Sequence, residues 1–79
     1  MTQPISIMVA DSHPAFREGL SRLLADDPEL AVVAQAADGR EALALARQHR
    51  PDVAIVDIFI TKLDSVDLVR EFKIGRAHV

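Results

Sequence analysis

Short apolar runs alternate along the chain with longer segments in which apolar side chains recur at helical spacing. The apolar runs at residues 5–10, 30–36 and 53–56 predict three β-strands. The segments at residues 14–24 and 39–48 have the spacing of amphipathic helices. This alternation predicts an α/β fold, in which a parallel sheet with right-handed crossovers has helices on both faces.

Local signals indicate where the helices begin and end. Pro14 suits the first turn of a helix, where its missing N–H costs nothing. Asp38 and Glu41 have the spacing of a capping box at the start of the second helix, and Pro51 follows its end. A third helix is expected at residues 66–72 after a polar loop.

Each of the first two helices has an apolar stripe that we expect to pack on the sheet. In the first helix the stripe consists of Phe16, Gly19, Leu20, Leu23 and Leu24. In the second helix it consists of Ala42, Leu45 and Ala46, which are small enough for a close approach to the strands.

The apolar run at residues 53–56 ends abruptly in Asp57. Its composition is typical of a strand buried on both faces. Asp11 ends the first strand in the same way. Open parallel sheets bind their ligands just beyond the carboxyl ends of the strands. If the two strands are neighbours, both carboxylates face one crevice.

Two adjacent carboxylates repel each other unless one is protonated or a cation lies between them. Oxygen ligands favour a hard ion, Mg²⁺ before Zn²⁺. A carboxylate beside Mg²⁺ is suited to attack a phosphoryl group. Either acid alone is more simply explained as the cap of a helix or turn, and His13 as part of the helix start. The matched positions of Asp11 and Asp57 favour a site.

Composition narrows the class of protein. A chain of 79 residues forms at most one small domain, and 49% hydrophobic with 27% charged residues is ordinary for a globular protein. The net charge of −3 argues against a nucleic-acid surface. The absence of cysteine excludes disulfides and thiolate zinc sites and fits a cytoplasmic protein. The first apolar run is too short for a signal peptide or membrane span.

Three stretches, at residues 9–20, 36–43 and 50–57, together resemble the receiver domain of bacterial response regulators. In particular they resemble the subfamily with a helix-turn-helix DNA-binding output domain. The resemblance covers about residues 5–73. It implies a flavodoxin-like fold with strand order 2-1-3-4-5, of which this chain has material for three strands and three helices.

The resemblance further implies that Asp57 accepts a phosphoryl group from a sensor histidine kinase. Asp11, Asp57 and the backbone carbonyl of Phe59 would hold Mg²⁺. Phosphorylation would regulate an output function, transcription, that is absent from this chain. Formation of a homodimer is one way in which phosphorylation could act on that output. On this interpretation the protein is a phosphotransfer substrate in two-component signalling and not an enzyme, and it contacts neither nucleic acid nor membrane.

The sequence departs from the family at several positions. Ser12 stands where the family usually has a second acid, and a hydroxyl is a weaker Mg²⁺ ligand. The loop after the phosphoacceptor carries unusual residues: Ile60, Thr61, Lys62 and Ser65. Nothing after Lys73 supplies the family's signalling Ser/Thr or its phosphate-pairing Lys. We therefore expect a partial receiver domain over residues 1–73, whose third strand has an unpaired edge.

Residues 74–79 do not continue the pattern of the preceding chain. They match one reading frame of a common sequencing-library adapter, so we interpret them as a non-native tail. The alternative is a helix terminus capped by Gly75.

Two other functions are compatible with these motifs. A degenerate interaction module would keep the fold, never take phosphate and act by dimerisation, and Ser12 favours it. A Mg²⁺-dependent phosphohydrolase with an aspartyl intermediate usually has a second Asp two residues after the nucleophile. Here Phe59 occupies that position, which argues against such an enzyme.

Overall fold

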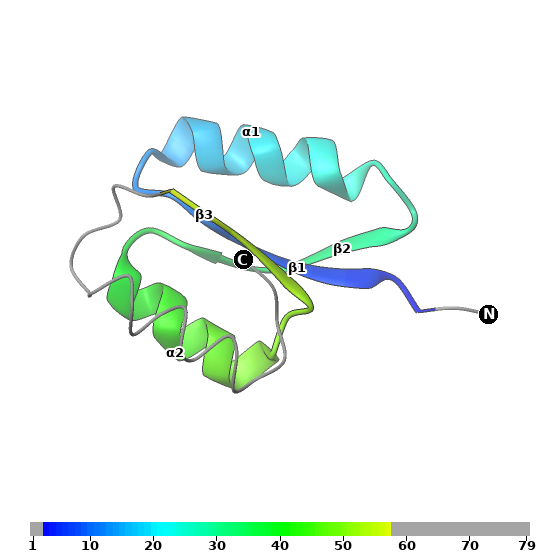
Figure 1. Cartoon of the computed structure of the whole chain (residues 1–79). Coiled ribbons are helices and arrows are strands. Elements are labelled where there is room, and N and C mark those ends of the chain that lie inside the picture. Colours follow the sequence, from blue (N-terminus) through cyan, green and yellow to red (C-terminus); the bar gives the residue numbers. More distant parts are fainter. Residues whose placement is uncertain (1–2, 58–79) are drawn as a thin grey trace.

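The computed structural model describes residues 3–57, in which three strands and two helices alternate (Figure 1). The elements are β1 (Ile5–Ala10), α1 (Pro14–Ala25), β2 (Leu30–Ala36), α2 (Gly39–His49) and β3 (Val53–Val56). The sequence predicts each boundary to within one residue. The expected third helix, the loop before it and the tail lie outside the described residues.

The three strands form a parallel sheet in the order β2-β1-β3. The helix α1 covers one face of the sheet and α2 covers the other (Figure 1). This arrangement follows from two right-handed crossovers, because the connection from β1 to β2 and the connection from β2 past β1 to β3 cross the sheet in opposite directions. The predicted fold class, a parallel α/β sheet with helices on both faces, is confirmed.

The buried side chains between α2 and the sheet are almost all alanines, with the half-buried Val33, Leu43, Leu45 and Val56 packed around them. Six of the seven buried residues in this cluster are alanines: Ala10, Ala34, Ala36, Ala42, Ala46 and Ala54. The seventh is Met8, which is fully buried at the centre of β1. The predicted stripe of α2 is confirmed, since Ala42 and Ala46 are buried on the sheet side. Small side chains on both surfaces let the helix lie close to the strands.

The predicted stripe of α1 is wrong in three places, and one of them is the exposed Gly19. Phe16 is 59% exposed and Leu23 is 71% exposed, whereas Ser21 is buried. Leu20 and Leu24 are half-buried. Within residues 3–57, α1 contacts β2 and β1 but not β3. Its apolar stripe is therefore wider than the part of the sheet beneath it.

The strand β3 is also less buried than its composition predicts. Ala54 is buried, but Ile55 is 37% exposed and Val53 and Val56 are half-buried. The physical reason is the position of the helices, because in the described part of the chain both lie mainly over β1 and β2. No helix in that part is long and apolar enough to cross a lipid bilayer.

The ends of α2 are closed by specific contacts. The Asp38 Oδ1 atom accepts a hydrogen bond of 2.9 Å from the Glu41 N–H, as the capping box predicts. Glu41 Oε1 accepts in turn from the N–H of Ala37, one residue before the cap. At the other end Arg50 has φ 46° and ψ 58°, a left-handed conformation that is costly for a residue with a Cβ atom.

We expect Arg50→Gly to stabilise the protein by about 0.5–1 kcal/mol. Glycine removes the steric cost of the left-handed conformation, which outweighs the added entropy of the unfolded chain. The matched control is Gln48→Gly in the last turn of the same helix, which should destabilise by about 1 kcal/mol. Urea unfolding followed by circular dichroism measures both. Loss of stability in both variants would contradict the explanation from backbone conformation.

Candidate functional site

Two aspartates lie side by side at the carboxyl edge of the sheet. The Asp11 N–H donates to the carbonyl of Ala36 at 3.0 Å, and the Asp57 N–H donates to the carbonyl of Ala10 at 2.9 Å. The hydrogen-bond ladders therefore continue one residue beyond β1 and β3. Because β1 and β3 are neighbours, the two acids leave the sheet at the same level.

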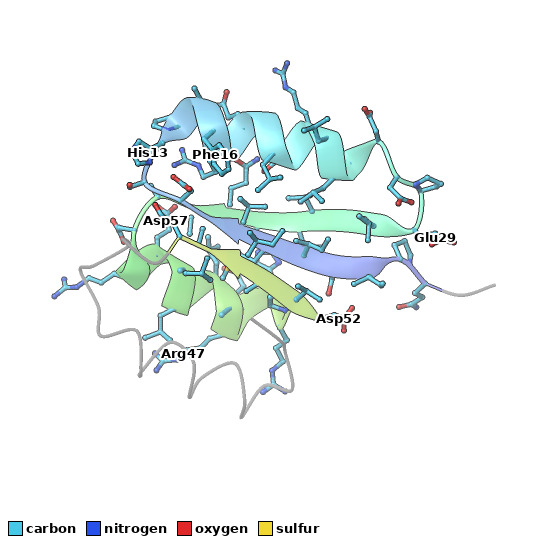
Figure 2. All side chains as sticks on the ribbon, turned by 45° about the horizontal axis from the view of Figure 1, so that its top comes forward. His13, Phe16, Glu29, Arg47, Asp52 and Asp57 are labelled. Carbon is cyan, nitrogen blue, oxygen red and sulfur yellow. The ribbon has the colours of Figure 1, made fainter. Side chains whose placement is uncertain are left out.

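The side chains of Asp11, His13 and Asp57 converge on one point. One carboxylate oxygen of each aspartate and one ring nitrogen of the histidine lie within 4.8 Å of one another. The Nδ1 atom of His13 is 2.9 Å from Asp11 Oδ1 and 4.0 Å from Asp57 Oδ2. The histidine is 74% exposed, whereas both aspartate side chains are largely covered. Figure 2 shows His13 and Asp57 together at this end of the sheet.

The surroundings of Asp11 favour its charged form. The backbone N–H of His13 donates to Asp11 Oδ1 at 2.8 Å and is the main cause of a lowered pKa. The His13 ring and the positive charge of Arg17 lower the pKa further, and burial opposes them. The carboxylate is therefore ionised at neutral pH. Arg17 also ties α1 to this turn, because its Nη1 donates to the Asp11 carbonyl at 2.8 Å.

The capping role expected for Asp11 alone is thus partly present, since the residue that it bonds, His13, is the N-cap of α1. The same carboxylate still faces Asp57. One side chain therefore fixes the turn between β1 and α1 and contributes negative charge to the crevice.

The donor atoms fit a hard divalent cation. Two ligands of one Mg²⁺ ion lie at most about 4.2 Å apart, since each is about 2.1 Å from the metal. The two carboxylate oxygens lie within 4.8 Å of each other, so a side-chain movement of less than about 1 Å would bring both within reach of one ion. Ser12, the predicted weak ligand, is an exposed residue between Asp11 and His13. The Phe59 carbonyl, the third predicted ligand, lies outside the described residues.

The sequence places His13 beside the acidic site but favours a role in the helix start over one in a metal shell. The sequence assigns it to the helix start, which is correct, but the structure also places its ring beside both acids. The signal is its position two residues after Asp11, in the tight turn from strand to helix. A side chain there can fold back over the strand end.

An open groove of about 280 Å³ adjoins the two acids. It runs between α1 and β3, and its apolar walls are formed by Val9, Ala10, Phe16, Leu20, Ile55 and Val56. Asp11 and Asp57 form its polar end. The exposed Phe16 and Ile55 are thereby explained as the two walls of one groove.

Known proteins share this architecture. Residues 7–78 match the response regulator receiver domain family. The transcriptional regulatory protein DegU of Brevibacillus brevis is 42% identical over 67 residues, which are 85% of this chain and 28% of DegU. Protein-glutamate methylesterase/protein-glutamine glutaminase 2 of Nitratidesulfovibrio vulgaris is 44% identical over 66 residues, which are 84% of this chain and 18% of that protein.

A solved structure agrees with these relatives. The crystal structure of the P1 domain of CheA3 in complex with CheY6 from R. sphaeroides contains a chain that matches with a TM-score of 0.84 and 29% identity. The match covers 96% of this chain and 60% of that one. The chain thus spans less than a third of the length of the two curated relatives. Sequence, strand order and the paired acids at the sheet edge agree, and the chain belongs to the family of response regulator receiver domains.

Proposed function

We propose that this receiver domain accepts a phosphoryl group on Asp57. The observation that carries the proposal is the convergence of Asp57 with Asp11 at the ends of adjacent parallel strands. We assign Asp11 to the cation and not to the phosphoryl group, because the backbone N–H and the ring of His13 hold one of its carboxylate oxygens in the turn. The open groove beside Asp57 gives a phosphodonor access from the side of α1.

Mg²⁺ is the proposed cofactor, with Asp11 and Asp57 as carboxylate ligands, the Phe59 carbonyl as a third and Ser12 as a weak one. The bound ion would offset the negative charge of the aspartates and of the incoming phosphoryl group. Asp11 contributes by staying ionised. His13 contributes by holding the Asp11 carboxylate in place through its backbone N–H.

The proposed phosphodonor partner is a sensor histidine kinase. The structure of the CheA3 P1 domain in complex with CheY6, which contains a chain similar to this one, supports this choice of partner. The proposed output is transcription, as the name of DegU suggests, and the methylesterase relative offers an enzymatic output as the alternative. In either case we propose that residues 1–73 act as a phosphotransfer substrate and not as an enzyme. The proposed location is cytoplasmic, with a homodimer as the form that phosphorylation favours.

Intact mass spectrometry tests this function. The chain is incubated with Mg²⁺ and acetyl phosphate, and we expect the mass of one phosphoryl group to be added. An acyl phosphate on aspartate is cleaved by hydroxylamine, whereas a phosphoserine is not, so hydroxylamine should remove the adduct. Chelation of Mg²⁺ should prevent its formation. A folded chain that gains no phosphoryl group would instead support the degenerate interaction module, which Ser12 favours.

We expect Ser12→Asp to increase Mg²⁺ affinity by roughly tenfold, since a charged oxygen replaces a neutral one beside the crevice. Isothermal titration calorimetry at constant ionic strength measures the change. Ala15→Asp is the matched control, because it adds the same charge at an exposed position in the first turn of α1. An equal gain in both variants would mean that long-range charge, and not ligation at position 12, is responsible.

A further inference from the structure

The amino-terminal ends of β1 and β3 are joined by side chains. Ser6 N–H donates to Asp52 Oδ2 at 2.9 Å, and Ser6 Oγ donates to the same oxygen at 3.0 Å. Asp52 N–H donates back to Ser6 Oγ at 2.8 Å. Figure 2 shows Asp52 at the opposite end of β3 from Asp57.

The sequence separation of Ser6 and Asp52 relates this contact to the acidic site. In the β1–β3 ladder every pair, from Ile7 and Val53 to Ala10 and Val56, differs by 46 residues. Ser6 and Asp52 differ by the same 46 residues at one end. Asp11 and Asp57 do so at the other end. The register that forms the Ser6–Asp52 contact is therefore the register that sets the two acids opposite each other.

The apolar pattern of β3 does not fix this register by itself. A slip by one residue would exchange the two faces of the strand. A slip by two would keep Val53 and Ile55 on one face and Ala54 and Val56 on the other. The chain also reaches β3 through α2, so no tight turn sets the alignment. On the other side of β1, the ladder to β2 does shift register between Ile7 and Met8.

A two-residue slip would disable the site. Strands rise by about 3.3 Å per residue, so Asp57 would move by about 6.6 Å along β1. That displacement exceeds the separation of about 4.2 Å that one Mg²⁺ ion can bridge. It would also break all three hydrogen bonds between Ser6 and Asp52.

We propose that Ser6 and Asp52 form a register clamp that positions Asp57 beside Asp11. The clamp acts through the strands and touches neither the cation nor the phosphoryl group, so both are positioning residues. The effect of the clamp on cation binding and phosphorylation rests on the proposed function. The alignment of β1 and β3 can be measured whether or not the proposed function holds.

The test uses the 79-residue chain with Ser6→Ala and Asp52→Ala. Mn²⁺ is the probe, followed by paramagnetic broadening of the Asp11 and Asp57 amide signals and by calorimetry. Cross-strand nuclear Overhauser effects between β1 and β3 report the register directly. We expect both variants to lose Mn²⁺ affinity by a factor of roughly 2 to 10, because each removes two of the three hydrogen bonds and an exposed hydrogen bond contributes little net free energy. A second set of cross-strand contacts, offset by two residues, should accompany the loss.

Two controls separate positioning from stability. Ser21→Ala removes the same hydroxyl from α1, where Ser21 Oγ donates to the Arg17 carbonyl at 2.7 Å. It should leave the β1–β3 register and the Mn²⁺ affinity unchanged at fixed fraction folded. Ser6→Thr retains the hydroxyl and should restore affinity and register.

Unchanged affinity and unchanged cross-strand contacts in folded Ser6→Ala and Asp52→Ala would overturn the clamp. So would an equal loss of affinity in Ser21→Ala. If the unaltered chain binds no Mn²⁺ at all, the proposed function fails. The cross-strand contacts of the variants then still decide whether the clamp sets the register.

Discussion

Asp57→Asn is expected to abolish the phosphoryl adduct that acetyl phosphate forms with this chain. An amide has no nucleophilic oxygen anion and cannot form the acyl phosphate bond. The substitution preserves size and keeps the backbone N–H that donates to the Ala10 carbonyl. We therefore expect the fold to survive, with circular dichroism close to that of the unaltered chain. Intact mass spectrometry measures the loss of the adduct.

The matched control for this variant is Asp38→Asn, which makes the same acid-to-amide change at the N-cap of α2. Asparagine caps helices about as well as aspartate, so stability should change little and the adduct should still form. An adduct that persists in Asp57→Asn and remains sensitive to hydroxylamine would mean that another carboxylate is modified. That result would contradict the assignment of Asp57.

Met8→Ala is expected to cause the largest loss of stability, about 2–5 kcal/mol. Met8 is fully buried in the central strand and is the one large side chain among the buried members of its cluster, the others being alanines. Its removal leaves a cavity that the alanines are too small to fill. Domains of this size have only about 5–15 kcal/mol of stability in total, so a large fraction unfolded is expected.

Leu23→Ala provides the comparison for Met8→Ala, because Leu23 is 71% exposed on α1. Truncation there should change the free energy of unfolding by less than about 0.5 kcal/mol. Urea unfolding of both variants gives the two values. A small loss for Met8→Ala, with unchanged dependence on urea, would show that the strands close around the vacated space.

Local sequence signals predict the elements of this fold well because each signal acts over a few residues. The Asp38–Glu41 spacing and the position of Pro14 specify helix starts, and the structure confirms both. The burial of α1 could not be predicted in the same way. Whether Phe16 is covered depends on which strands lie beneath the helix, and that is a property of the sheet order.

In the site, too, some features follow from local sequence signals and others depend on the folded structure. The ends of the two apolar runs identify Asp11 and Asp57, and the rule for parallel sheets brings them to one edge. The part played by His13 depends on how a turn folds back, which residue type alone does not specify. Ser6 and Asp52 are separated in the sequence by the same number of residues as Asp11 and Asp57. This equal separation predicts a contact only once the register of β1 and β3 is known.

The alanine-rich layer under α2 has a thermodynamic consequence. A methyl group removes little apolar surface from water, so a core of alanines contributes little to the heat capacity change of unfolding. The free energy of unfolding should accordingly vary less steeply with temperature than in a domain where large aliphatic side chains, such as the buried Ile7 and Val9, fill both faces of the sheet. Close packing of small groups, more than the exclusion of water from large ones, then sets the temperature range in which the two aspartates are held together.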